Sequence, residues 1–204
     1  MSATAFESLA KSHWTEEEYL AGVELDPELK YEFVSGRVFA MATPSGVHAE
    51  ISSNIFIPLH THQRGKPCRV FKGDMALHIR FLNRPVFYIP DSLVACDDGD
   101  LAKNFREKPL LIVEVMSKST QGNDLREKLW AYCAIPGLRH YLVVNQQAVE
   151  VTHFYRMDDG WQEVTLVDPE SVISIPELGY RLTVWEIYAN TGVGTPEGPA
   201  AGGA

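Results

Sequence analysis

Two carboxylates each interrupt an apolar segment that is typical of a buried strand. Glu114 lies within PLLIVEVM (residues 109–116), whose other members are apolar, and Asp91 directly follows Pro90 in FYIPDSLV. A strand that is apolar on both faces is typical of the centre of a covered sheet. An ionised carboxylate there is costly unless it is paired, hydrogen-bonded or bound to a metal. These two residues are therefore the first candidates for a functional site.

The chemistry expected of this pair is the binding of a divalent cation. Because Pro90 has no N–H to donate, it suits a bulge or sheet edge, where a strand can turn a side chain out of the pleat. If the two strands are neighbours, Asp91 and Glu114 point at one spot and repel each other unless a cation lies between them or one is protonated. Oxygen ligands in an open coordination sphere suit Mg²⁺ or Mn²⁺, and the backbone carbonyl of Val115 is a further possible ligand.

Lys128 is a third candidate, in a segment expected to be helical (residues 124–137). Leu125, Leu129 and Tyr132 form the expected buried stripe of this helix, and Lys128 borders that stripe. A lysine in this position can reach the sheet and place its ammonium group near a metal. There it would orient or help deprotonate a water molecule and stabilise charge on a phosphate.

Each candidate also has a purely structural interpretation. Glu114 could form a buried ion pair with an arginine, and Asp91 could be a turn residue after proline. Lys128 could be an exposed partner of Asp124, four residues earlier. Asp74 is a further polar residue, for which a turn or strand position is the simpler interpretation. The pairing of Asp91 with Glu114 favours the functional interpretation of both.

The elements that must position these residues are short strands alternating with helices. Thr15 and Glu18 form a capping box at the start of a first helix, and the turn at Ser35-Gly36 predicts a hairpin. A helix containing Pro58 is expected from about 45 to 63, because apolar residues recur there every four positions. The further expected elements are strands within 68–79, 86–96 and 110–116, a polar loop over 97–108, the helix 124–137, a strand over 139–144, a hairpin around 158–160 and a short closing element.

This order predicts a mixed α/β sheet with helices packed against it. The strand–helix–strand step from 110 to 144 implies a right-handed parallel crossover, and the tight connections before it imply antiparallel pairing. Residues 1–190 are expected to form a single domain, and the Gly/Pro/Ala-rich residues 191–204 a flexible tail.

Composition limits the classes of function. Eighteen Lys and Arg against 27 Asp and Glu give a formal charge of −9, which argues against a generic nucleic-acid binder but not against an enzyme with a local metal site. Any DNA contact is then expected in a local basic patch, for which the candidates are Arg64, Lys66, Arg69 and Lys72. No G-x-S-x-G, P-loop or G-x-G-x-x-G motif occurs, so serine-hydrolase, nucleotide-hydrolase and dinucleotide-binding functions lack their minimum motifs.

The cysteines and the apolar runs predict a cytoplasmic protein. Cys68, Cys96 and Cys133 are odd in number and far apart, and they form no C-x-x-C pair. They are expected to be reduced thiols. The first residues show no apolar region of the signal-peptide type, and no apolar run approaches the roughly 20 residues that span a bilayer.

Together, these motifs resemble the PD-(D/E)XK nuclease superfamily and, more closely, the Uma-type family of restriction-endonuclease-like proteins. The resemblance covers roughly residues 14–188 and rests on the order of YEFVSGRVFAMA…H, IPDSLV, LLIVEVMSKST, D…K…Y and IPGLRHYLVV. It implies a restriction-endonuclease-like αβββαβ core, with an N-terminal helix and β-hairpin and extra C-terminal strands. It also implies that Asp91 and Glu114 are metal ligands.

The resemblance departs from the superfamily motif at one position. Met116 occupies the place where E-x-K would put lysine, and Lys118 lies beyond it in an expected loop. Family members of this kind are similar in having the lysine on the following helix, and Lys128 matches that position. Glu32 and His48 match polar positions that line the site in such proteins. His48 would hold a water or touch a phosphate, and Glu32 would complete the outer shell of the metal.

The sequence therefore predicts a Mg²⁺- or Mn²⁺-dependent endonuclease that hydrolyses phosphodiester bonds in nucleic acid, with DNA as the expected substrate. A homodimer is the expected assembly, because nucleases that cut both strands of a duplex often pair two active sites. The alternative is a nuclease-fold module with little or no catalysis that binds a protein or nucleic-acid partner. Met116 in the lysine position and the acidic net charge motivate this alternative.

Overall fold

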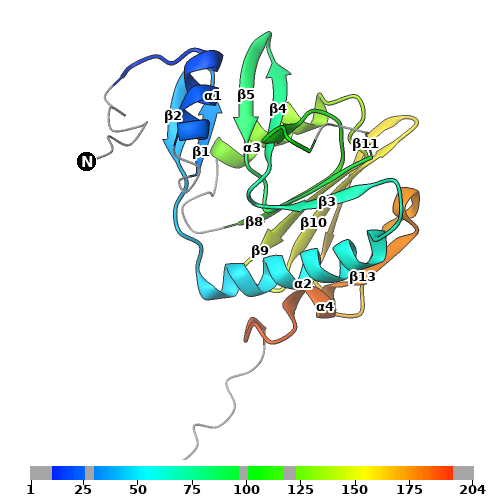
Figure 1. Cartoon of the computed structure of the whole chain (residues 1–204). Helices are drawn as coiled ribbons and strands as arrows, with labels where there is room; N and C mark the ends of the chain where they lie inside the picture. Colours follow the sequence, from blue (N-terminus) through cyan, green and yellow to red (C-terminus); the bar gives the residue numbers. More distant parts are fainter. Residues whose placement is uncertain (1–10, 26–29, 97–100, 117–122, 195–204) are drawn as a thin grey trace, which may run out of the picture.

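A six-stranded mixed sheet forms the centre of the computed structural model, which describes residues 11–25, 30–96, 101–116 and 123–194 (Figure 1). Strands β8 and β9 pair in parallel, and α3 (Asn123–Cys133) lies between them in the chain, as the sequence predicts; the other pairs are antiparallel. Across the sheet the order is β11 (Gly160–Leu166), β10 (Val151–Met157), β9 (His140–Asn145), β8 (Pro109–Met116), β6 (Ser92–Ala95) and β3 (Arg69–Lys72).

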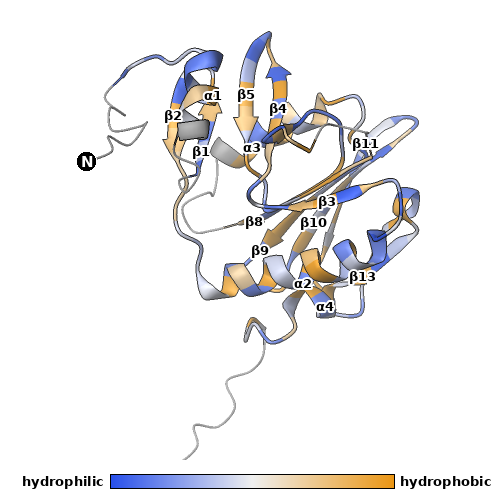
Figure 2. Cartoon of the chain, viewed as in Figure 1, coloured by the Kyte–Doolittle hydropathy of each residue, from blue (hydrophilic) through white to orange (hydrophobic). Residues whose placement is uncertain are grey.

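Strand β8 is covered on both faces, which explains its nearly continuous apolar sequence. Val113 and Val115 contribute to the hydrophobic core under α2 (Gly46–Gln63), and Ile112 to the core under α3. The two helices lie on opposite sides of the sheet, and its inner strands are hydrophobic (Figures 1 and 2). Because side chains alternate along a strand, Glu114 shares the α3 face with Ile112.

Helix α2 has the predicted bounds and the predicted buried stripe. Ile51, Ile55 and Leu59 are almost fully buried against the sheet. The side chain of Ser45 accepts a hydrogen bond from the backbone N–H of His48 and caps the helix. Pro58 lies inside the helix without ending it, since the helix continues to Gln63.

Two of the predicted strands are each divided between two sheets. The segment 68–79 forms β3 and β4 (Ala76–Phe81), and the segment 86–96 lies in β5 (Arg84–Tyr88) and β6. The first segment turns at Gly73–Asp74, where the N–H groups of Asp74 and Met75 both donate to the carbonyl of Lys72. The second breaks at Pro90, which lacks an N–H and therefore cannot continue the ladder. The prediction of continuous strands is wrong at these two points.

The second sheet gathers the N-terminal hairpin and the β4–β5 hairpin in the order β2-β1-β5-β4-β7. Strands β1 (Tyr31–Val34) and β2 (Arg37–Ala40) meet at the predicted turn, where Ser35 and Gly36 have φ angles of 51° and 89°. Helix α1 (Glu16–Leu25) begins at the predicted capping box of Thr15 and Glu18.

The expected polar loop over 97–108 contains a strand that the sequence did not reveal. Residues 97–100 lie outside the described part, but β7 (Phe105–Arg106) pairs in parallel with β4. Arg106 is only 3% exposed and stacks over the ring of Phe71 at 4.7 Å. Its guanidinium also donates to the carbonyl of Phe105 at 2.8 Å. An arginine that is buried in this way fixes the segment against the sheet.

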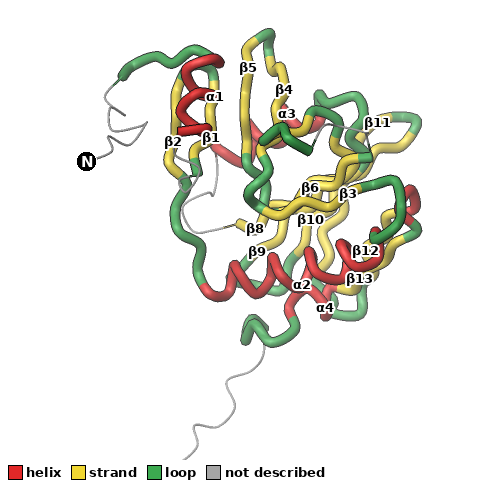
Figure 3. The backbone as a smooth tube through the Cα atoms, viewed as in Figure 1, coloured by secondary structure: helices red, strands yellow, loops and turns green. Residues whose placement is uncertain are grey.

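The C-terminal segment packs on α2, on the same side of the central sheet (Figure 3). Asn54 of α2 donates to the carbonyls of Ile187 and Ala189 at 3.1 and 2.8 Å. Of the expected tail, residues 195–204 lie outside the described part. The elements of this segment are β12 (Val172–Ile175), η1 (Pro176–Leu178), β13 (Tyr180–Thr183) and α4 (Val184–Tyr188).

Two of the three cysteines form a disulfide, contrary to the prediction of reduced thiols. Cys68 is bonded to Cys96 across 28 residues of sequence, and Cys133 is free. The pairing of β3 with β6 sets Arg69 opposite Ala95, which brings the cysteines at the ends of these two strands together. Within the described part of the chain, no helix is long and apolar enough to cross a membrane.

Candidate active site

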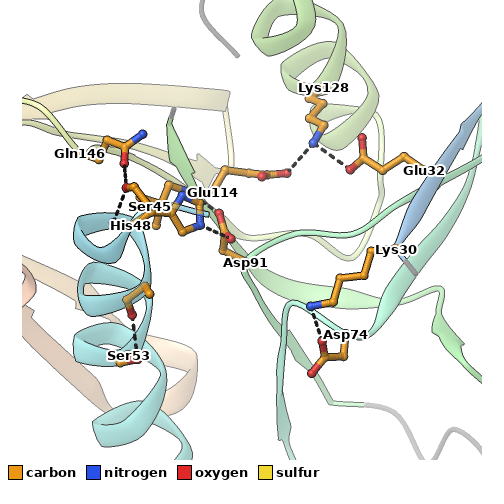
Figure 4. Close-up of polar contacts among 12 residues, drawn as sticks. Lys30, Glu32, Ser45, His48, Ser53, Asp74, Asp91, Glu114, Lys128 and Gln146 are labelled. Carbon is orange, nitrogen blue, oxygen red and sulfur yellow. Dashed lines mark hydrogen bonds and ion pairs between the residues drawn. The ribbon is translucent and has the colours of Figure 1, made fainter. Parts of the chain in front are cut away.

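Five polar side chains from five segments of the chain meet around one end of β8 (Figure 4). They are Glu32 of β1, His48 in the first turn of α2, Asp91 before β6, Glu114 of β8 and Lys128 of α3. All five were singled out from the sequence, and all are largely shielded from solvent, with side-chain exposures between 9% and 19%. The site therefore lies where the sheet meets α2 on one face and α3 on the other.

Asp91 is turned out of its strand and held by the backbone of β8. Its Oδ2 accepts a hydrogen bond from the N–H of Val115 at 2.7 Å. This bond is possible because Ser92, the next residue, pairs with Val113 in the β6–β8 ladder. The prediction for Val115 concerned its carbonyl oxygen, whereas the contact that the structure shows is made by its N–H.

His48 lies against the other oxygen of Asp91. The His48 Nε2–Asp91 Oδ1 distance is 2.7 Å, and the two side chains are 15% and 19% exposed. The start of α2 is fixed on both sides, since the Ser45 hydroxyl that caps the helix also donates to Gln146 Oε1 at 2.6 Å. Gln146 directly follows β9, so the end of the sheet holds the helix turn that carries His48.

Lys128 bridges the two glutamates of the site. Its Nζ lies 3.0 Å from Glu32 Oε1 and 3.2 Å from Glu114 Oε1. Glu32 also accepts a hydrogen bond from the N–H of Ile89 at 3.0 Å. Its contact with Lys128 connects the second sheet to α3. Because the Lys128 residue is only 7% exposed, its interpretation as a solvent-facing helix residue is wrong.

Tyr132 is a site residue to which the sequence analysis assigned only a packing role. It lies one turn after Lys128 on α3 and donates from its hydroxyl to Glu114 Oε1 at 2.8 Å. Burial, followed by the nearby charge of Glu114, raises the pKa of the Tyr132 hydroxyl well above its usual value. The sequence did contain an indication of this role. Tyr132 lies in the expected buried stripe of the helix, four residues after Lys128, and a buried tyrosine hydroxyl usually requires a hydrogen-bond partner.

The pKa of the Glu114 carboxyl is raised well above its usual value. Burial raises its pKa to about 7, and the charges of Asp91 and Glu32 act in the same direction. The ammonium of Lys128 and the hydroxyl of Tyr132 lower the pKa but do not outweigh these effects. Asp91 and Glu32 thus disfavour the ionised form of Glu114, and a divalent cation bound between the carboxylates would relieve this repulsion.

The donor set fits a sparsely ligated hard cation. Among the described residues, no group of three or more His, Cys, Asp or Glu side chains is arranged to hold a metal ion. Asp91 and Glu114 supply two carboxylates, and Mg²⁺ is commonly bound by one or two carboxylates together with water and substrate phosphate. No described residue donates a hydrogen bond to Glu114 Oε2, whereas both oxygens of Asp91 are engaged. Glu114 therefore has one oxygen without a hydrogen bond from a described residue, and Asp91 has none.

Two other positions after Glu114, Met116 and Lys118, bear on which lysine serves the site. Met116, two residues after Glu114, ends β8 and packs against the hydrophobic core on the α3 side. Lys118 lies outside the described residues. Within the described part of the chain, Lys128 is therefore the lysine that contacts Glu114.

Asp74, the further polar candidate, forms an ion pair with Lys30 in a turn, apart from the five site residues (Figure 4).

The four candidate residues for a basic patch lie on and beside the edge strand β3. Lys72 pairs with Ser92, the neighbour of Asp91, and is exposed. Arg64 and Lys66 follow the far end of α2 and, with Arg69, line a surface pocket. Since α2 is 18 residues long, this pocket lies about 25 Å along the helix from His48. Of the four, Lys72 is the one beside the site.

The sequence matches one family over most of its length. Residues 16–184 match the Uma2 family, which is described as "Putative restriction endonuclease". The chain belongs to this family.

Two curated relatives from Synechocystis sp. share 31% identity with the chain. Over 173 residues it is similar to "Uncharacterized protein slr1290", with 84% of this chain and 90% of the relative covered. Over 150 residues it is similar to "Uncharacterized protein sll1609", with 71% and 82% covered.

The fold is similar to that of a solved protein described as "a putative nuclease belonging to DUF820 from Anabaena variabilis". The TM-score is 0.62, with 92% of this chain and 98% of the other covered. Because the sequences are only 15% identical, this similarity concerns the fold: a mixed α/β architecture.

Proposed function

We propose that the protein is a metal-dependent endonuclease that hydrolyses phosphodiester bonds in DNA. The observation that carries this proposal is the approach of Asp91 and Glu114 at one end of β8, with Lys128 hydrogen-bonded to Glu114. Family membership and the nuclease-like fold support it. The αβββαβ core of the restriction-endonuclease-like fold would then correspond to α2, β3, β6, β8, α3 and β9.

The residues of the site would divide the work of hydrolysis. Asp91, Glu114 and the carbonyl of Val115 would hold Mg²⁺ or Mn²⁺, which when bound supplies Lewis-acid stabilisation and lowers the pKa of water. Lys128 would orient the attacking water and stabilise the negative charge that develops on the phosphate oxygens. Its ammonium is held for this role by Glu32 at 3.0 Å.

His48 would act on the side of the site opposite to Lys128. Asp91 holds one ring nitrogen of His48 at 2.7 Å, so the imidazole has a fixed orientation. It would hold a water molecule or donate to a phosphate oxygen. The two faces of the sheet would thus contribute different groups, His48 from α2 and Lys128 from α3.

DNA would approach along the edge strand β3. Lys72 is exposed beside Ser92 and Asp91, and Arg69 is exposed at the other end of the same strand. Arg64 and Lys66 would extend this contact past the end of α2. Because the net charge is −9, binding would depend on these few cations and weaken strongly with added salt.

The test is cleavage by purified protein of plasmid DNA, single-stranded DNA and RNA, with Mg²⁺, with Mn²⁺ and with chelator. We expect metal-dependent cleavage of DNA that Asp91→Ala and Glu114→Ala each reduce by at least 100-fold, because each removes a charged ligand. Arg80→Ala is the matched control, since Arg80 is exposed on β4 and contacts Glu16. Cleavage by Asp91→Ala at the wild-type rate would refute the assignment.

A second candidate function is a catalytically inactive module that binds a protein or nucleic-acid partner. Met116 in the superfamily's lysine position favours it. Crystals soaked in Mn²⁺ separate the two, because the enzyme requires density between Asp91 and Glu114, whereas the module does not. For either function we propose a homodimer, which sedimentation of the purified protein would test.

We also propose a cytoplasmic location, which now rests on the apolar runs alone, because the Cys68–Cys96 disulfide is of a kind that is rare in cytosolic proteins. Cell fractionation would test it.

A further inference from the structure

One oxygen of Glu114 receives two hydrogen bonds from the same helix. Lys128 Nζ and the Tyr132 hydroxyl lie 3.2 and 2.8 Å from Glu114 Oε1. Tyr132 follows Lys128 by four residues, so the two donors project from the same face of α3, one turn apart. No described residue donates to the other oxygen, Oε2. The carboxylate is therefore held from one side only.

The ring of Tyr132 is immobilised by two other tyrosines. It is fully buried and makes edge-on contacts with Tyr88 and Tyr141, at centroid separations of 5.5 and 5.1 Å. Edge-to-face aromatic pairs at this distance are favourable. With the ring fixed, the hydroxyl occupies one position. An ionised carboxylate can only accept hydrogen bonds, so in the contact between Tyr132 and Glu114 the tyrosine hydroxyl is the donor.

Lys128 alone does not define the position of Glu114 to the same degree. Its ammonium is shared with Glu32 at 3.0 Å and sits at the end of a flexible four-carbon stem. The phenol is rigid, and it donates at the shorter distance. The hydroxyl is thus the donor better suited to fix the rotamer of the carboxylate.

We propose that Tyr132 is a positioning residue that holds Oε1 of Glu114 and so leaves Oε2 directed at the site for a divalent cation. This role rests on the proposed metal-dependent function, but its first consequence, the orientation of Glu114, does not require a metal. Partners of this kind, one shell out from a metal, typically change its affinity by 10–100-fold. The aromatic cluster beneath the site would then tune the cation site without touching the cation.

The experiment uses Tyr132→Phe, which removes the hydroxyl and keeps the ring. Mn²⁺ affinity is measured by electron paramagnetic resonance on the full chain, and crystal structures of the metal-free wild type and variant are compared. Tyr188→Phe is the matched control. The Tyr188 hydroxyl is also a buried donor, to the carbonyls of Asn145 and Glu150 at 2.7 and 2.8 Å, but it lies on the α2 side of the sheet.

We expect Tyr132→Phe to weaken Mn²⁺ binding at least tenfold and to turn the Glu114 carboxylate away from its wild-type position, while Tyr188→Phe changes affinity less than twofold. An unchanged Glu114 carboxylate together with wild-type Mn²⁺ affinity would overturn the proposal. If the wild type binds no Mn²⁺, the proposed metal-dependent function fails. In that case a displaced Glu114 in the Tyr132→Phe crystal still supports the positioning role, and an undisplaced one refutes it.

Discussion

His48 Nε2 and Asp91 Oδ1 lie 2.7 Å apart although 43 residues separate them in the sequence. The contact joins the first turn of α2 to the point where the chain enters β6. The other oxygen of Asp91 is held by the N–H of Val115, so this carboxylate connects the helix to the central strand. Any cation that binds Asp91 must share it with an imidazole.

Replacement of His48 should affect catalysis more than stability. His48→Ala removes one partner of Asp91 but leaves its bond from Val115, so the free energy of unfolding should fall by about 1 kcal/mol. If His48 holds water or phosphate as proposed, its loss should reduce the cleavage rate by about 100-fold or more. Urea unfolding and initial rates of plasmid cleavage measure the two effects.

The control for this variant is Ser53→Ala on the exposed side of the same helix, where the hydroxyl donates only to the carbonyl of Ala49. It should leave both quantities near wild type. If His48→Ala lowers the free energy of unfolding but cleaves plasmid DNA at the wild-type rate, the role of His48 is structural.

Removal of Lys128 should be costly because it leaves two buried carboxylates without their shared cation. Lys128→Met removes the partner of both Glu32 and Glu114. Breaking a buried ion pair from one side typically costs about 3–5 kcal/mol. The loss should be larger at pH 8 than at pH 5, because protonation of Glu114 at low pH relieves the uncompensated charge.

Chemical denaturation at the two pH values checks this expectation. Arg126→Met, on the exposed side of α3, is the matched control and should change the free energy of unfolding by less than about 0.5 kcal/mol. Equal losses for Lys128→Met and Arg126→Met would contradict a buried bridge.

The pH dependence of stability should contain two opposing contributions. The pKa of Glu114 is raised from 4.5 to about 7 by burial. The unfolded chain therefore ionises first, and stability from this group is lost as pH rises from about 4.5 to 7. A shift of this size corresponds to roughly 3 kcal/mol.

His153 acts in the opposite direction. Burial, followed by the charge of His140 at 3.0 Å, lowers its pKa from 6.5 to about 4. The unfolded chain binds the proton first, so stability is lost as pH falls from about 6.5 to 4, again by roughly 3 kcal/mol. The side chain is buried, and His140 also contacts Glu177 at 2.7 Å.

Between pH 4.5 and 6.5 these two contributions should nearly cancel in the wild type, and single variants should reveal them. Glu114→Gln should become less stable on acidification through this window, and His153→Gln more stable. The measurement is the free energy of unfolding in urea at half-unit pH steps. If the free energy of unfolding changes with pH in the same way in both variants, at least one of the two pKa shifts is absent.

The Cys68–Cys96 disulfide should stabilise the edge of the central sheet. It closes a loop across 28 residues, for which the constraint on the unfolded chain is worth about 2–4 kcal/mol. Reduction with dithiothreitol, or the double change of Cys68 and Cys96 to Ser, should lower the free energy of unfolding by this amount. Cys133→Ser serves as the control because Cys133 is free. Wild-type stability after reduction would contradict a structural role for the bond.

The local features of the fold could be predicted from the sequence because their physical causes are local. The capping box of Thr15 and Glu18, the turn at Ser35-Gly36 and the stripe of α2 each depend on residues within a few positions of one another. The apolar run around Glu114 likewise indicated a covered strand. Local conformational preference and hydrophobic periodicity were sufficient for these elements.

Other features depend on contacts that the sequence does not encode locally. A short apolar run does not say which sheet it joins, so the division of 68–79 between β3 and β4 was missed. The Cys68–Cys96 bond depends on the register of β3 and β6, which only pairing of the strands defines.

In the candidate site, too, the residue types could be predicted from the sequence, whereas their contacts could not. Asp91 and Glu114 in otherwise apolar segments, and Lys128 beside the apolar stripe of its helix, indicated ionic chemistry, because a buried charge requires a partner. That Lys128 meets Glu32, 96 residues earlier, and that Tyr132 holds one oxygen of Glu114 were decided by the tertiary structure. Those contacts follow from the docking of α3 on one face of β8 and of α2 on the other, and long-range packing of this kind sets which polar groups meet.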